Sequence, residues 1–321
     1  MSEKTNRRKG NDKVPGCLEV PDGSRSRDLL RYGLSILGFG IERQRCSLEL
    51  CRDRFRAHYG PCPKAIKTLI ALLKEHQSEK EIDIYHLFMA LCWLRLYDTE
   101  HVMAGRWGFG EKYCRKIVWE YVERVQGLKP ILINFNDLSP EVKFAPIDTK
   151  HKPCLEFTCT PSSKWWSHKF NGPGVAFEVV CNPVDRGLML WAAGPYPAGT
   201  HDLTILRGGK KGEQKKWKQS ALYNNLPDTL RLIGDAAYSG QSDKVSVTMD
   251  AHSADTKETF ARMKSMQETC FKRFADYEVI DGSFRHGMGT DDKLEKVGMA
   301  FDAVAVLIQL DIATEHPLMK P

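Results

Sequence analysis

Residues 231–240 are RLIGDAAYSG, and this stretch decides the fold expected for the chain. The apolar residues of RLIG predict a short buried strand, and Asp235 stands directly at its end. The run KFAPID at 143–148 predicts a second strand, which ends in the same way with Asp148. Because neighbouring strands can deliver their terminal side chains to one edge of a sheet, we expect these two carboxylates to lie close together.

A third acid, Glu268, lies within residues 256–277, where apolar side chains recur at helical spacing. The expected buried stripe consists of Phe260, Met263, Gln267, Phe271 and Phe274. At about 100° per residue, Glu268 sits roughly 80–90° from the middle of that stripe, at the boundary between core and solvent. Carboxylates from two strand ends and a helix could hold a pair of divalent cations and hydrolyse or transfer a phosphodiester bond. Any one acid alone is better explained as a cap or a solvated charge, so the prediction depends on all three.

The second half of the chain combines strand patterns with helical ones. Residues 170–182 and 186–196 are apolar strand patterns separated by a turn at 183–187, which predicts an antiparallel hairpin. A helix is expected to begin after Asp202, its N-cap, and a long apolar helix over 293–316 closes the domain. This order predicts an α/β or α+β domain, built on a mixed sheet flanked by helices.

The first half of the chain predicts helices alone. Residues 1–27 are rich in Gly, Ser, Pro, Lys and Arg, which predicts a disordered basic tail. Residues 28–130 are predicted to be helical, with a break at 59–63 where Gly and Pro occupy positions typical of helix ends and starts. At about 83–126, helices on either side of a glycine-containing turn have the outline of a helix-turn-helix. A plain helical hairpin fits the same pattern.

Basic residues in this helical region are candidate DNA contacts. They are Arg52, Arg54 and Arg56, followed by Lys112, Arg115 and Lys116 on the outer face of the last helix. The inner side of that helix is expected to carry Tyr113, Ile117, Val118, Tyr121 and Val125. Residues 1–80 contain 17 Lys and Arg against 10 Asp and Glu, whereas the remainder contains 30 against 31. This asymmetry favours an electrostatic grip on a polyanion, although a solvated basic tail would give the same counts.

Composition narrows the class of protein. Hydrophobic residues make up 42% of the chain and charged residues 27%, as in ordinary globular proteins. The sequence has no run of ~18 consecutive apolar residues of the kind that spans a membrane. The first residues, MSEKTNRRKGNDK, are polar and basic, so we expect no secretory signal. Without one, the ten scattered cysteines are expected to be reduced thiols in the cytosol or nucleus.

The second half also resembles a known family, from residue 144 to about 319. The matching stretches are PIDTKHKP (146–153), SSKWWSHKFNGPGVAFEV (162–179), GPYPAGTHDLTIL (194–206), LIGDAAYSG (232–240), the helix with Glu268, and FDAVAVLIQLDIATEHPL (301–318). In this order they resemble the DDE endonuclease domain of transposases of the PIF/Harbinger type, with relatives in algae and other protists. The helix-turn-helix at 83–126 resembles the one that precedes the nuclease in that group.

The resemblance implies a ribonuclease H-like fold for 144–319 and a role for each acid. Asp148, Asp235 and Glu268 would be the catalytic and metal-binding residues, and the cofactor would be Mg²⁺ or Mn²⁺. The implied partner is double-stranded DNA, with a homo-oligomer or an accessory DNA-binding protein as further candidates and no membrane. Water would attack a phosphate at the element end, and the freed 3′-hydroxyl could then attack target DNA. The implied location is the nucleus, after synthesis in the cytosol. A domesticated DNA-binding protein that keeps the fold without cutting DNA is the alternative.

Weaker candidates complete the expected site. Lys164, Trp165, Trp166 and Lys169 mix bases with aromatics, which suits phosphate contact and base stacking but equally a strand packed in the core. His201 and Asp202 could support the metal site or orient DNA, although capping is the expected role of Asp202. The spacing of Cys46, Cys51, His58 and Cys62 matches no common zinc finger.

Overall fold

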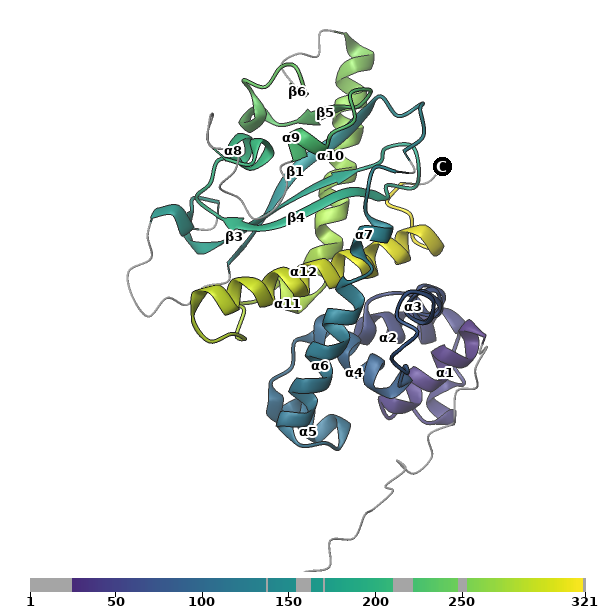
Figure 1. Cartoon of the computed structure of the whole chain (residues 1–321). Helices are drawn as coiled ribbons and strands as arrows, with labels where there is room; N and C mark the ends of the chain where they lie inside the picture. Colours follow the sequence, from purple (N-terminus) through teal and green to yellow (C-terminus); the bar gives the residue numbers. More distant parts are fainter. Residues whose placement is uncertain are drawn as a thin grey trace, which may run out of the picture.

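The computed structural model describes residues 25–136, 138–153, 163–169, 171–209, 222–247 and 253–319. Nearly all of the tail predicted for residues 1–27 lies outside these ranges, although the last two of those residues already belong to the first helix. Figure 1 shows a helical N-terminal region on one side of the long helix α12 and a mixed sheet on the other. The predicted α/β class with a preceding all-α region is therefore the class observed.

The helices of the N-terminal region end where the sequence places caps. Gly60, with a φ of 88°, follows α2, and Pro63 is the first residue of α3. Thr99 precedes α5, and Gly108, with a φ of 72°, follows it. These helices are α1 (Ser26–Ile36), η1 (Ile41–Gln44), α2 (Leu48–Tyr59), α3 (Pro63–His76), α4 (Ile84–Leu96), α5 (Glu100–Trp107), α6 (Glu111–Gln126) and α7 (Lys129–Leu132).

Six strands of the described residues form one mixed sheet. They are β1 (Phe144–Pro153), β2 (Trp166–Ser167), β3 (Gly172–Cys181), β4 (Met189–Pro197), β5 (Arg231–Gly234) and β6 (Val245–Val247). The order is β2-β3-β1-β5-β6, and β4 also pairs with β3. The predicted hairpin of β3 and β4 is confirmed, since the two strands pair antiparallel. In contrast, β1 pairs parallel to β5, and β5 pairs parallel to β6.

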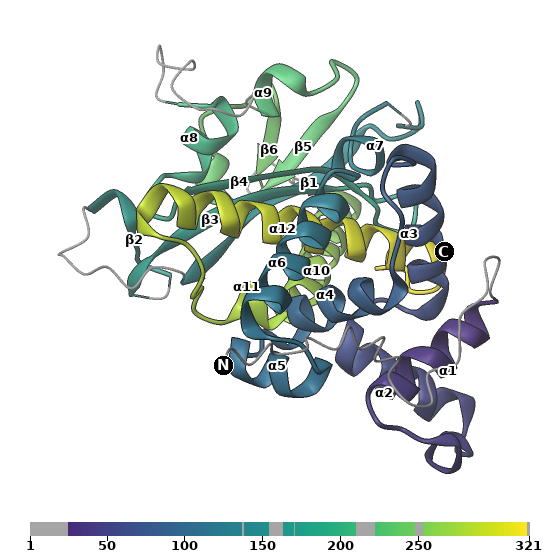
Figure 2. The same cartoon turned by 60° about the horizontal axis from the view of Figure 1, so that its bottom comes forward.

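Short and long helices cover both faces of the sheet (Figures 1 and 2). They are η2 (Ser163–Trp165), α8 (Asp202–Arg207), α9 (Leu222–Asn225), η4 (Ala236–Tyr238), α10 (Ala254–Ala275), α11 (Glu278–Asp281) and α12 (Gly289–Thr314). Helix α12 packs against α3 and α6 on one side and against β4 on the other. One continuous hydrophobic cluster therefore joins the helical region to the sheet.

Helix α12 is long and apolar enough to cross a membrane by length and composition, although no uninterrupted apolar run was expected. Of its most apolar 18-residue window, 72% is buried inside the fold. Figure 2 shows why, since α12 lies between the sheet and the N-terminal helices. The apolar surface of this helix is therefore accounted for by the core that it shares with both regions.

Helix α6 buries a slightly different face from the predicted one. Its residues Ile117, Val118, Tyr121 and Val125 are buried as expected. The prediction for Tyr113 is wrong, because its side chain is 40% exposed. Cys114 takes the inner position instead, and Tyr113 packs against Phe109 at the rim of the helix pair.

Candidate functional site

Asp148 lies inside β1, and Asp235 directly follows the adjacent parallel strand β5 at the same register. The predicted strand end at Asp148 is wrong, because β1 continues to Pro153 through its pairing with β3. The last paired residues of β1 and β5 are Pro146 and Ile233. Each aspartate stands two positions beyond its strand's member of that pair. Because parallel neighbours lie ~4.8 Å apart, this register brings both aspartates side by side just beyond the point where the pairing of β1 with β5 ends. Asp148 is half-buried, whereas Asp235 is exposed and accepts a hydrogen bond from Ala237 N at 2.8 Å.

Asp148 projects from the face of the sheet that α10 covers. Cross-strand partners share a face, so Asp148 and Lys150 point the same way as their partners Val179 and Phe177. Phe177 stacks on Phe301 of α12, and α10 packs on β1 and β3 from the same side. The helix that carries Glu268 therefore covers the face from which Asp148 projects.

Glu268 is exposed, which differs from the expected position at the core boundary. The buried residues of α10 are Met263, Met266, Gln267, Cys270 and Phe274. Their mean direction is displaced from the predicted stripe because Met266 and Cys270 face the sheet, which places Glu268 about 140° from the middle of the buried face. Gln267 anchors this arrangement, since its Nε2 donates to Val179 O at 3.1 Å. Glu268 therefore lies in solvent on the α10 side of the sheet.

Asp202 approaches Asp148 from the opposite face of the sheet. It is buried, and one carboxylate oxygen accepts a hydrogen bond from Thr149 Oγ1 at 2.7 Å. His151 Nε2 and Lys169 Nζ each lie 3.9 Å from its carboxylate. The predicted N-cap role of Asp202 is wrong, because His201 caps α8 and accepts from Leu203 N. Asp202 is instead turned inward, one position after the cap.

The pKa values of Asp148 and Asp202 are shifted in opposite directions. Burial raises the pKa of Asp148 to about 6, and the neighbouring carboxylates of Asp235 and Asp202 push it further upward against Thr149 N–H and Lys169. Burial also tends to raise the pKa of Asp202, but the nearby imidazole of His151, the hydrogen bond from Thr149 and the charge of Lys169 outweigh it and hold this pKa below its usual value. The site therefore gathers negative charge that Lys169, itself half-exposed, balances only in part. Crowded carboxylates of this kind are the donor set that a hard divalent cation requires.

A buried acid that the sequence analysis did not identify lies behind the site. Glu178 is the cross-strand partner of Thr149 and is fully buried. Its Oε2 accepts from Trp191 Nε1 at 3.2 Å, whereas Oε1 and the hydroxyl of Tyr238 are buried without a hydrogen-bond partner. Burial raises the pKa of Glu178 to about 8. The available signal was a glutamate inside the apolar strand GVAFEVV, where a charged side chain is rare.

The candidate DNA contacts of the helical region differ in whether their side chains are exposed or already bound to other groups of the protein. Lys112 and Lys116 are exposed on α6, as expected for outward residues. Arg115 is also exposed, but it forms an ion pair with Glu100 of α5. Arg52 is exposed on α2. Arg54 donates to the carbonyl oxygen of Arg43 and to Cys46 Sγ, and Arg56 forms an ion pair with Asp311.

The candidate DNA contacts that precede β3 also include both exposed and buried side chains. Lys164 and Lys169 are exposed. Trp165 is only 8% exposed, with Lys164 Nζ 5.1 Å from its ring centroid, so its ring packs in the core. Trp166 begins β2 and is half-buried. The two exposed lysines could therefore contact phosphates, whereas the two tryptophans are less accessible for base stacking.

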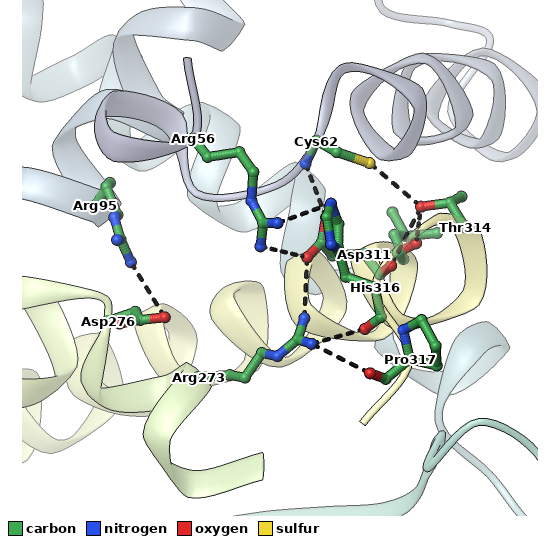
Figure 3. Close-up of polar contacts among 10 residues, drawn as sticks. Arg56, Cys62, Arg95, Arg273, Asp276, Asp311, Thr314, His316 and Pro317 are labelled. Carbon is green, nitrogen blue, oxygen red and sulfur yellow. Dashed lines mark hydrogen bonds and ion pairs between the residues drawn. The ribbon is translucent and has the colours of Figure 1, made fainter. Parts of the chain in front are cut away.

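A Cys/Asp/His group that could hold a metal ion lies elsewhere in the described residues. Cys62, Asp311 and His316 each place one ligand atom within 4.8 Å of the others. Figure 3 shows that these atoms already have protein partners. Asp311 accepts from Cys62 N at 2.8 Å and from Arg56 and Arg273 at 3.0 and 3.1 Å. Arg56 Nη1 also lies 2.7 Å from His316 Nε2. An ion would have to displace two guanidinium groups to bind there.

Comparison with known proteins gives little further information. No protein-family model and no curated protein matches this chain. Among solved structures, the chain is similar to the crystal structure of a pre-cleavage Mos1 transpososome, which aligns over 92% of this chain and 94% of the other. The sequence identity is 11% and the TM-score is 0.24, and at these values the likeness does not establish a shared fold.

Proposed function

We propose that the chain is a transposase-like, metal-dependent DNA endonuclease. The observation that supports this most strongly is the shared register of Asp148 and Asp235 on adjacent parallel strands, with α10 on the face from which Asp148 projects. The mixed sheet with helices on both faces is compatible with the ribonuclease H-like fold that the sequence resemblance implies. The proposal keeps Glu268 of α10 as the third ligand, and its solvent-facing side chain would have to turn toward the sheet to reach a metal held by Asp148 and Asp235.

The residues of the site fit a hard divalent cation. Burial and two neighbouring carboxylates raise the pKa of Asp148, so a bound cation would stabilise its ionised form. Asp148, Asp235 and Glu268 would hold Mg²⁺ or Mn²⁺, which when bound supplies activation of a water molecule and stabilisation of the leaving oxygen. Lys169, 52% exposed beside Asp202, is placed to contact a phosphate of the DNA strand. Thr149 and His151 would fix Asp202 behind the reacting carboxylates.

The proposal is tested by cleavage of supercoiled plasmid DNA with the purified full chain. Nicking should require Mg²⁺ or Mn²⁺ and should fall to the protein-free level in Asp235→Ala. Asp228→Asn is the matched control, because the Asp228 side chain is fully exposed and pairs with Lys244 rather than lying in the site. Cleavage by Asp235→Ala at the wild-type rate would refute the assignment.

A second measurement separates the loss of a ligand from misfolding. In Asp148→Asn, one buried charge beside two other carboxylates is removed, so the metal-free variant should melt no lower than wild type. The same variant should lose the thermal stabilisation that Mg²⁺ or Mn²⁺ gives to the wild-type chain. If wild type binds DNA by electrophoretic mobility but shows no metal stabilisation and no cleavage, the domesticated DNA-binding protein is the correct reading.

A further inference from the structure

A cavity of about 300 Å³ lies where the helical region meets the C-terminal helices. Its lining includes Arg56 of α2, Arg95 of α4 and Arg273 near the end of α10. Figure 3 shows these three side chains entering the same region from three separate ribbons. None of them belongs to the sheet-edge site, so the cavity is a second place where charge converges.

Two of the arginines share one buried carboxylate. Arg56 Nη2 and Arg273 Nη1 both donate to Asp311 Oδ2, at 3.0 and 3.1 Å. The side chain of Asp311 is only 5% exposed, and its other oxygen accepts from the backbone N–H of Cys62. The lining as a whole has three arginines and three aspartates, but on the inner wall two guanidinium groups face the single buried carboxylate of Asp311.

The third arginine, Arg95, forms few polar contacts with the protein. The side chain of Arg95 is 20% exposed, lies over the ring of Tyr277 and approaches Asp276 only to 3.9 Å. Among the described residues, none accepts a hydrogen bond from the Arg95 guanidinium group. The Asp276 side chain is 60% exposed, and Asp53, the remaining acid of the lining, is also exposed. Water screens both of these acids, whereas the arginines are the more buried charges.

We propose that this cavity binds a small anion bearing a phosphate or diphosphate group, with Arg95 as the main ligand. Guanidinium groups offer paired N–H donors that match phosphate oxygens in a bidentate geometry. A bound anion would take the place of Asp276 beside Arg95. Arg56 and Arg273 already donate to Asp311, and Arg273 also donates to the carbonyl oxygens of His316 and Pro317, so they would contribute mainly their charge. Because these side chains come from α2, α4 and α10, the anion would link the helical region to the helix that carries Glu268.

The test is binding of pyrophosphate and inorganic phosphate to the metal-free full chain, measured by calorimetry and thermal shift at matched ionic strength. Arg95→Gln should weaken pyrophosphate binding about tenfold or more, because one charge-assisted bidentate contact is lost. Asp276→Asn should strengthen binding, because the competing carboxylate is removed. Arg115→Gln is the control, since Arg115 is an exposed arginine paired with Glu100 outside the cavity.

The signature that supports the site is the opposite sign of the Arg95 and Asp276 variants with no change in the control. Should Arg95→Gln melt well below wild type, Arg95→Lys keeps the charge without the paired donors and should still weaken binding. A 5′-phosphorylated oligonucleotide that competes with pyrophosphate, when its 5′-hydroxyl counterpart does not, would identify a DNA end as the source of the phosphate. Absence of binding by wild type, or equal weakening in Arg95→Gln and Arg115→Gln, overturns the proposal.

Discussion

Glu178→Gln is expected to stabilise the chain at neutral pH. The carboxyl group is fully buried between β1 and β4, and burial raises its pKa from 4.5 to about 8. At neutral pH it is therefore protonated in the folded chain and ionised in the unfolded chain. Glutamine resembles the protonated acid in shape and retains an oxygen that can accept from Trp191 Nε1.

The magnitude follows from the two pKa values. Because the folded chain holds a proton that the unfolded chain releases, the free energy of unfolding falls as pH rises from 4.5 toward 8. Each pH unit in that window costs about 1.4 kcal/mol, so the cost reaches about 3 kcal/mol at pH 7. Glutamine does not ionise, and the variant should recover most of that amount.

The assay is urea unfolding followed by tryptophan fluorescence at several pH values between 5 and 8. The difference between Glu178→Gln and wild type should be below about 1 kcal/mol at pH 5 and should increase steadily to neutral pH. Glu141→Gln, at an exposed position, serves as the control and should follow the wild-type curve. A difference that does not change with pH, or a variant less stable than wild type at pH 7, would refute the reasoning.

Three further variants test other buried polar groups by chemical denaturation. Lys152→Met should lower the free energy of unfolding by about 2–4 kcal/mol, because the buried carbonyl oxygen of Ile280 and the partly buried one of Gly282 lose their donor, whereas Lys150→Met on the same strand should change it little. Burial lowers the pKa of His286 to about 4, so the unfolded chain binds the proton and stability falls as pH drops from 6.5 toward 4. Because His286 is only partly buried, His286→Gln should remove at most about 2 kcal/mol of this acid sensitivity. Asp311→Asn should cost about 2–3 kcal/mol, because two arginines lose the carboxylate that they share.

Most helices and strands are predictable from residues that lie close together in the sequence. Gly60 and Pro63 mark the end of α2 and the start of α3, and the turn at 183–187 joins two strands that pair as expected. The strand end before Asp235 is predictable for the same reason, since a polar residue after an apolar run marks the point where burial stops. The predicted end at Asp148 is wrong, because pairing with β3 carries β1 on to Pro153 through the polar residues that follow. The three-residue strand β6 was missed because so short a run carries no periodic signal.

The sequence by itself determined most of the succession of helices and strands and the position of Asp235 directly after β5. It could do so because capping residues and apolar periodicity act between positions a few residues apart. Only the tertiary structure decided that Asp202 turns inward to Thr149 and that Arg56 meets Asp311, 255 positions away in the chain. Such pairs depend on which faces of distant elements pack together, and the burial that results is what sets their charge and their role.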